Sequence, residues 1–231
     1  MLNIIIMFIE IIFIFTAMAM LTKLLGRYGA ISYVSIATIV ADILALQSIK
    51  VAGINIPIFV VLFISIFIAT NLITECYGVN IARKSVYTGL CINIIFTSIL
   101  QIILWCSTPT LDAIDYTLKN FFPFNATTII SLTIVYFVPL IINTFVYEKL
   151  IGKDRNKYMW LRNIISTTIC GWAISLILTI ITSIGRRTIK ETIITIGSVL
   201  IIELITILCS TPFLYLTKYL LKKRFIKRKY L

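Results

Sequence analysis

The sequence predicts an all-α membrane protein, a polytopic bundle of about seven transmembrane helices. Of its 231 residues, 60% are hydrophobic and only 13% are charged, and the mean hydropathy is +1.04. A typical soluble domain carries about twice that share of charged residues. The apolar stretches are continuous rather than alternating at every second residue, which favours helices over a β-barrel. Several of them reach the roughly 20 residues that a helix needs to cross a bilayer core.

Seven apolar segments follow one another along the chain, with no separate soluble domain between them. Their approximate bounds are 3–25, 30–49, 56–76, 85–106, 126–147, 161–184 and 192–217. The first contains Glu10 and has no basic residues before it, so we expect a retained helix rather than a cleaved signal. Asp42 lies within the second, so six helices plus one half-inserted segment are the alternative. We expect a single transmembrane domain over 1–217 and a basic cytoplasmic tail over 218–231.

Positive charge is distributed unevenly between the predicted loops. The chain has 21 Lys and Arg against nine Asp and Glu, a formal net charge of +12. If the C-terminus is cytoplasmic, 16 of the basic residues lie on the inner side. The five that remain outside are Lys50, Lys119, Arg186, Arg187 and Lys190. This bias follows the positive-inside rule for a multi-pass protein of the cell membrane with its N-terminus outside. Membrane lipid, rather than nucleic acid, is the partner we expect for the tail.

Several classes of chemistry lack the residues they need. The chain has no histidine, and its five cysteines form no C-x-x-C pair, so neither a metal site nor paired disulfides are expected. G-x-S-x-G, H-E-x-x-H and the phosphate-binding G-x-x-x-x-G-K-[ST] are also missing from the sequence. We therefore expect no enzyme and no cofactor.

Polar residues recur at helical spacing inside the apolar segments. Ionisable groups within a span usually face a cavity or pathway, whereas Ser and Thr are explained by contacts between helices. Asp42, Asn71, Asn93 and Glu203 are therefore candidates for a site, while Glu75 and Glu148 lie near predicted helix ends, where exposure to water is the alternative. The stripes are Ser35, Thr38 and Asp42; Asn71, Thr74 and Glu75; Asn93, Thr97 and Gln101; Asn163, Thr167, Gly171, Ser175 and Thr179; and Glu203, Thr206 and Ser210.

Three motifs carry a resemblance to a known family. The first is Asn-Leu-Ile-Thr-Glu-Cys-Tyr-Gly over 71–78, followed by Ala-Arg-Lys over 82–84. The second is Trp-Leu-Arg-Asn over 160–163 with Ser166 and Thr167, and the third is Thr-Pro-Phe-Leu-Tyr over 211–215. With these three motifs in this order, the chain resembles the queuosine precursor transporter family, also called the vitamin-uptake-transporter-like family.

The chain departs from that family at several polar positions. Asn71 stands where the family usually has Asp, and Glu203 falls where a Lys is expected. The two Q-x-x-D pairs of the family correspond here to Leu140 with Asn143 and to Gly171 with Ile174.

The resemblance implies an inner-membrane transporter that imports a deazapurine, chiefly 7-cyano-7-deazaguanine or its aminomethyl relative, for tRNA modification. A guanine-like edge has adjacent N–H donors that one carboxylate accepts together, and amides can read the rest of that edge. The motifs and stripes together give the substrate-binding candidates Asp42, Asn71, Glu75, Asn143, Arg162, Asn163, Thr167 and Glu203. We expect Asp42, Asn71, Asn143, Asn163 and Glu203 to line one cavity. Two alternative functions stay open: a substrate-binding subunit of an ATP-driven vitamin importer, and a membrane scaffold without transport. Assembly into a homo-oligomer or with importer subunits also stays open.

The charge bias makes a prediction about orientation. Reporters fused after Leu231 and inserted within residues 112–119 should report opposite sides of the membrane, with the C-terminal reporter in the cytoplasm, because basic loops are retained on that side. Paired fusions that are active only outside or only inside the cell measure this directly. A C-terminal reporter found outside would contradict the predicted orientation.

Overall fold

The computed structural model describes residues 2–44, 48–51, 54–105, 126–151, 158–183 and 188–229. Within them the chain forms seven helices, which confirms the predicted all-α bundle. The helices are α1 (Leu2–Leu25), α2 (Arg27–Leu44), α3 (Phe59–Tyr77), α4 (Val79–Trp105), α6 (Ala126–Ile151), α7 (Met159–Ser183) and α8 (Ile189–Lys229). Five of these described helices, α1 to α4 and α8, are long and apolar enough to cross a membrane.

Some features named above lie outside the described residues. They are the 112–119 loop with Lys119, the basic residues Arg186 and Arg187, and the last two residues of the tail. The rest of the predicted tail continues α8 as far as Lys229, so the boundary at 217 does not coincide with a helix end.

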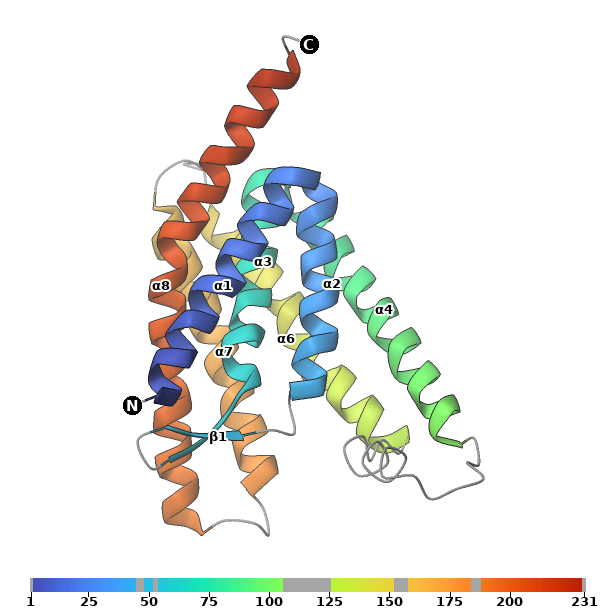
Figure 1. The fold of residues 1–231 in the computed structure, drawn as a ribbon, viewed down its shortest axis with the longest axis vertical. Coiled ribbons are helices and arrows are strands. Elements are labelled where there is room, and N and C mark those ends of the chain that lie inside the picture. Colours follow the sequence, from blue (N-terminus) through green and yellow to red (C-terminus); the bar gives the residue numbers. More distant parts are fainter. Residues whose placement is uncertain are drawn as a thin grey trace.

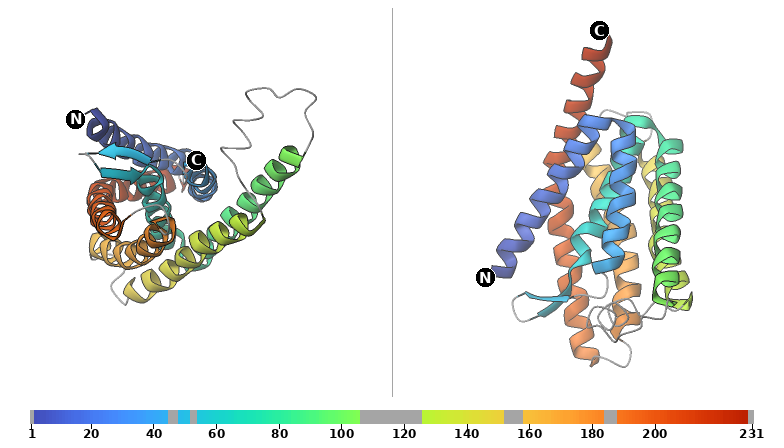
Figure 2. Two further views of the ribbon diagram at one scale, coloured as in Figure 1. Left: turned by 90° about the horizontal axis from the view of Figure 1, so that it is seen from below. Right: turned by 45° about the vertical axis from the view of Figure 1, so that its right-hand side comes forward.

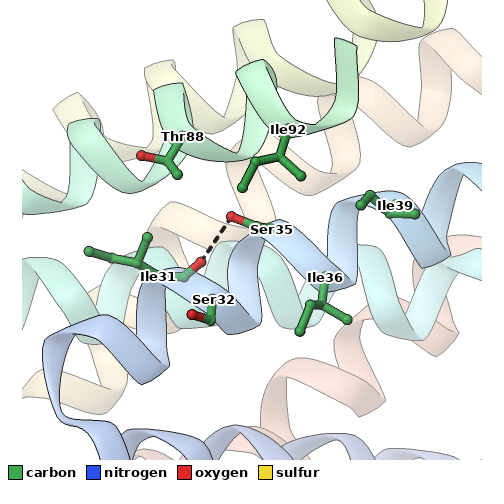
Figure 3. A pocket seen from close by; sticks show the side chains of 7 residues that line it. All are labelled: Ile31, Ser32, Ser35, Ile36, Ile39, Thr88 and Ile92. Carbon is green, nitrogen blue, oxygen red and sulfur yellow. Dashed lines mark hydrogen bonds between the residues drawn. The ribbon is translucent and has the colours of Figure 1, made fainter. Parts of the chain in front are cut away.

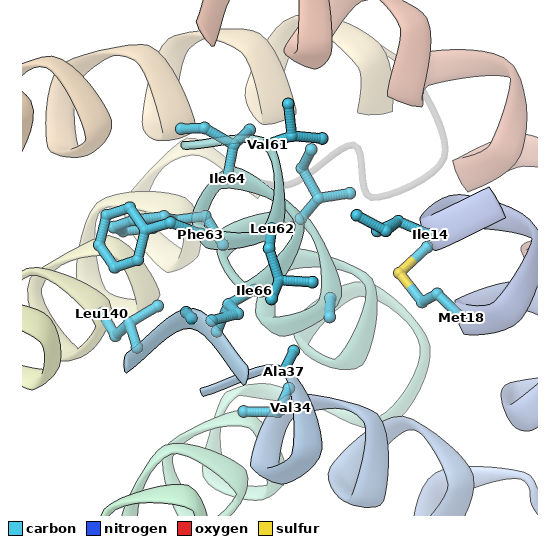
Figure 4. Close-up of a cluster of buried hydrophobic side chains, with 14 of the residues drawn as sticks. Ile14, Met18, Val34, Ala37, Val61, Leu62, Phe63, Ile64, Ile66 and Leu140 are labelled. Carbon is cyan, nitrogen blue, oxygen red and sulfur yellow. The ribbon is translucent and has the colours of Figure 1, made fainter. Parts of the chain in front are cut away.

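The central element of the bundle is α3, which contacts each of the six other described helices. Its first eleven residues, 59–69, are apolar except for Ser65, a pattern that predicts burial on every side. In agreement, 94% of its apolar window is buried inside the bundle. Figures 1 and 2 show α3 enclosed by its neighbours. Figure 4 shows the packing of its apolar side chains against those of α1, α2 and α6, with the labelled residues Ile14, Met18, Val34, Ala37, Val61, Leu62, Phe63, Ile64, Ile66 and Leu140.

A short antiparallel hairpin, which was not predicted, precedes α3. In it β1 (Ser48–Val51) pairs with β2 (Ile54–Pro57), so that Ile49 lies opposite Ile56. The predicted second segment extends to 49 and the third begins at 56; both ends are wrong, because α2 ends at Leu44 and α3 begins at Phe59. Ile and Val favour strands, and apolar content alone does not distinguish a short strand from the end of a helix.

The outer and inner faces of the bundle differ in polarity, as a lipid environment requires. Large apolar side chains point outward, among them Phe13 of α1, Ile95 of α4 and Ile177 of α7. The predicted polar stripes are confirmed as inward faces, with only Gln101 classed as partly buried. Fully buried members of these stripes include Thr74, Asn163, Thr167, Glu203, Thr206 and Ser210. The polar groups therefore avoid lipid and meet one another inside the bundle.

Helices α1 and α2 approach each other most closely near the corner between them. Gly26, at that corner, has a φ of 67°, in the left-handed region that favours glycine. At Gly29 an added Cβ would lie 2.0 Å from the carbonyl oxygen of Leu21 and 2.6 Å from its carbonyl carbon. Any side chain at position 29 would therefore push the two helices apart.

Replacing Gly29 tests this packing. Gly29→Ala should destabilise the protein by at least the roughly 1–3 kcal/mol typical of overpacking, because the backbone of Leu21 cannot rotate away. The thermal unfolding midpoint of the purified protein in detergent measures the effect. Gly197→Ala is the matched control, since its Cβ would meet nothing within 4 Å and alanine is favoured in a helix by about 0.5–1 kcal/mol. Equal midpoints for the two variants would contradict the close contact of α1 with α2.

Candidate functional site

Asn71 of α3 is the centre of a buried amide network. Helical spacing places it beside Thr70 and one turn before Thr74 and Glu75, and all four are buried. The amide nitrogen of Asn71 lies 2.9 Å from the Oδ1 of Asn163 and 2.9 Å from the hydroxyl of Thr167, both on α7. The Ser166 hydroxyl lies 3.1 Å from the same nitrogen, whose two hydrogens are thus shared among three oxygens. Because a carboxylate at position 71 has no N–H to donate, this arrangement requires the amide.

Asn143 of α6 extends the network on the other side of α3. Its amide nitrogen donates to the Oδ1 of Asn71 at 2.7 Å. The three amides therefore form a chain from α6 through α3 to α7, which we call the amide chain (Asn143, Asn71 and Asn163). Its two ends are open: among the described residues, neither the Oδ1 of Asn143 nor the Nδ2 of Asn163 has a hydrogen-bond partner, although both are buried. Buried amide groups are nearly always paired, so these two atoms are the candidates in this network for contacts with a bound molecule.

A charged cluster lies one helical turn further along α3. Glu75 accepts from the guanidinium of Arg162 on α7 at 3.0 and 3.1 Å and from the ammonium of Lys218 on α8 at 2.9 Å. The hydroxyl of Tyr147 on α6 lies 3.2 Å from the same carboxylate. We call these four residues the Glu75 cluster. The alternative that Glu75 is exposed to water is wrong, since its side chain has no exposed surface. Glu148, by contrast, is exposed and pairs with Arg83 at 2.7 Å.

Glu203 of α8 lies toward the opposite end of the bundle from the Glu75 cluster. One of its carboxylate oxygens accepts a hydrogen bond from Ser175 of α7, and the other has no partner. Gly171, one turn before Ser175, lies beside the carboxylate: an added Cβ would make an ordinary contact, at 3.6 Å, with the Oε2 of Glu203 and a tight one, at 3.0 Å, with the Cδ1 of Ile64. The α7 stripe thus passes from the amide chain to Glu203 along one helix face.

Asp42 lies apart from these groups, at the interface of α2 and α4. It accepts a hydrogen bond from the amide of Asn93, and both side chains are buried. Tyr33, further back on α2, donates to Ser65 of α3 at 2.6 Å. These contacts place the polar face of α2 on the α4 side of α3, whereas the amide chain joins α3 to α6 and α7.

The structure therefore brings together most, but not all, of the predicted substrate-binding residues. Asn71, Asn143, Asn163 and Thr167 form one network, Glu75 and Arg162 form the adjoining ion pair, and Glu203 follows on the same face of α7. A single cavity lined by five of them stays a prediction. The pocket in Figure 3, of 260 Å³, lies instead between α2 and α4, and none of the eight predicted substrate-binding residues line it. Its lining is Ile31, Ser32, Ser35, Ile36, Ile39, Thr88 and Ile92.

Two residues of the Glu75 cluster were not predicted. Tyr147 follows Asn143 by four residues, so the two share a helix face, and that spacing was the available signal. Lys218 was assigned to the basic tail, but its ammonium group turns back to the bundle. A long lysine side chain can reach a partner about one helical turn away from its own backbone, which sequence spacing does not reveal.

An apolar exterior around a buried polar interior, on helices long enough to span a bilayer, defines a multi-pass membrane protein. The family described as "Putative vitamin uptake transporter" matches residues 57–217, and the chain belongs to this family. The chain is also 24% identical to the "Probable queuosine precursor transporter" of Bacillus subtilis (strain 168) over 196 residues, which cover 84% of this chain and 85% of that protein. No solved structure gives a significant match. The resemblance found in the motifs is thus confirmed. The matched range includes the amide chain, Glu203 and three of the four residues of the Glu75 cluster, with Lys218 one residue beyond its end.

Two Glu–Arg pairs among the described residues provide a matched test of burial. Glu75→Gln should destabilise the protein by about 3–5 kcal/mol, because it leaves the buried guanidinium of Arg162 and the partly exposed ammonium of Lys218 without a counter-charge. Glu148→Gln should change stability by at most about 1 kcal/mol, because its pair with Arg83 is exposed. Unfolding of both variants in the same detergent compares them. Similar losses would mean that the Glu75 cluster is hydrated rather than buried.

Proposed function

We propose that this transporter imports a small purine-like molecule, a base of the 7-deazaguanine type that serves as a queuosine precursor. The observation that carries the proposal is the amide chain, whose open acceptor and open donor lie in the interior of a membrane bundle. The name of the Bacillus subtilis relative supports the same substrate class.

The chemistry of the amide chain suits a neutral heterocycle. The six-membered ring of a guanine-like base has a lactam edge, in which an N–H donor lies next to a C=O acceptor. The Oδ1 of Asn143 can accept from that N–H, while the Nδ2 of Asn163, at the far end of the amide chain, can donate to another acceptor of the base, such as a ring nitrogen. Leaving a buried polar group unpaired costs about 1–3 kcal/mol. A ligand that forms hydrogen bonds with both ends of the amide chain removes this cost, and the free energy gained favours its binding.

A site built from amides also binds a ligand less tightly than a site built from carboxylates, so the ligand is released more easily. A neutral base held by neutral hydrogen bonds forms contacts of modest net strength, which favours both entry and departure. The Glu75 cluster lies about 6 Å beyond Asn71 along α3, where it joins α3, α7 and α8. In this proposal the cluster closes that end of the path while the substrate is bound.

Removing the open groups tests the proposal. Asn143→Leu and Asn163→Leu should each weaken binding of 7-cyano-7-deazaguanine by roughly 5- to 150-fold, because a buried ligand group is then left unpaired at a cost of about 1–3 kcal/mol. Affinity is measured on purified protein and normalised to the folded fraction, and uptake is measured in cells that cannot make the base.

Two controls accompany this experiment. Ser65→Ala removes a buried hydroxyl from the α2 side of the same central helix and should leave affinity unchanged. A 7-deazaadenine analogue, which has no lactam edge, should not compete. The proposal fails if wild-type protein neither binds nor takes up the deazaguanine, or if both leucine variants bind it as wild type does.

A further inference from the structure

Glu203 is a carboxyl group in the interior of the bundle that the proposed substrate contacts do not use. It lies 14 residues into α8, and its side chain has no exposed surface. One carboxylate oxygen accepts from Ser175, while the other has no hydrogen-bond partner and faces the space between Gly171 and Ile64. The group is therefore held in place by one hydrogen bond but is not neutralised by it.

The described surroundings of Glu203 contain no counter-charge within an ion-pair distance. The helices packed against α8 are α1, α3 and α7. On α7 the charged group is Arg162, which lies 13 residues, or about 20 Å, from the level of Ser175 and pairs with Glu75. On α3 the acidic group is Glu75 itself, and the other titratable groups of α3 and α7 are Cys76, Tyr77 and Cys170.

Helices α1 and α8 carry further charged groups. On α1 they are Glu10, which is half-buried, and Lys23, near the far end of that helix. On α8 itself the nearest described basic residues are Lys190 and Lys218, each more than three turns from Glu203. The hairpin strand β2, which also contacts α8, has no titratable residue in its sequence. Glu203 thus differs from Glu75 and Glu148, which both have a basic partner.

A buried carboxyl with these contacts is stable only in its neutral form or with a cation brought to it. An unpaired carboxylate in a low-dielectric interior is strongly disfavoured, and such groups take up a proton instead. A protonated carboxyl still accepts the hydrogen bond from Ser175, so the observed geometry is retained. Ionisable groups in this position within membrane spans are characteristic of proton pathways.

We propose that Glu203 is a proton-binding site that couples substrate import to the movement of a proton, an inference that rests on the transport function proposed above. The carboxyl takes up a proton from the outer side and gives it up to the inner side when the bundle opens there. The stripe of Asn163, Thr167, Gly171 and Ser175 connects the amide chain to Glu203 along one face of α7, so both sites respond to the same helix movement. Coupling to one proton supports roughly fifty-fold accumulation of a neutral substrate at a typical membrane potential.

The first experiment needs no substrate. Infrared spectra of the purified protein in lipid, recorded as the pH is raised, should show the C=O stretch of a protonated carboxyl that disappears at higher pH. The band should lose intensity in Glu203→Gln, which keeps the size and the hydrogen bond of the side chain, and should keep its intensity in Glu10→Gln, which removes the acidic residue of α1. Asp42→Asn identifies any contribution from the other buried carboxyl. A band of unchanged intensity in Glu203→Gln, or a wild-type protein without any such band, would overturn the proton site.

The second experiment measures coupling in proteoliposomes that contain a pH indicator. Addition of 7-cyano-7-deazaguanine should drive proton entry with the wild-type protein and with Glu10→Gln, whereas Glu203→Gln should lose proton entry by at least about tenfold while labelled substrate still equilibrates. Proton entry retained in Glu203→Gln, or loss of substrate binding in that variant, would overturn the coupling role. If the wild-type protein moves no deazaguanine at all, the proposed substrate fails, and the infrared result still decides whether Glu203 binds a proton.

Discussion

The burial of α3 on all sides is the constraint on which the rest of the structure depends. Within a bilayer, a polar side chain on such a helix has no water to hydrogen-bond with, so it must form its hydrogen bonds inside the bundle, largely with other helices. Thr70, Asn71, Thr74 and Glu75 all lie on the last two turns of α3, and each bond that Asn71 or Glu75 makes to a neighbour also fixes the rotation of that neighbour. The positions of α6, α7 and α8 follow from satisfying this one short stretch of sequence.

Neutral and charged polar side chains occupy different levels of the bundle interior. The amide chain contains only groups that carry no net charge, and it spans three helices near the middle of the bundle. The charged residues are placed to either side of it: the Glu75 cluster toward the C-terminal end of α3 and Glu203 toward its N-terminal end. A neutral ligand at the level of the amide chain would therefore contact uncharged hydrogen-bonding groups. It would meet charged residues only on moving toward the Glu75 cluster or toward Glu203.

Much of this arrangement could be predicted from residue spacing, and the limits have clear causes. A stripe such as Asn163, Thr167, Gly171 and Ser175 predicts which face of its own helix is buried, and every such face was found inside the bundle. Spacing within one helix does not say which other helix that face meets. For that reason Asp42, which belongs to an equally good stripe, was grouped with Asn71 but pairs with Asn93 on the other side of α3. Lys218 was missed because its charge suits a cytoplasmic tail as well as an ion pair, and only the direction of a flexible side chain distinguishes the two.

The sharing of one carboxylate by two cations has a consequence for how this end of the bundle responds to water. The carboxylate of Glu75 has no exposed surface, whereas the Lys218 side chain is 34% exposed. Moving α8 away from α3 would separate opposite charges at the buried carboxylate, where the attraction between them is strongest. Once water reached Glu75, the same separation would become less costly, and the excess positive charge of Arg162 and Lys218 would repel the two helices that carry them. Hydration of Glu75 and separation of α8 from α3 would therefore each favour the other.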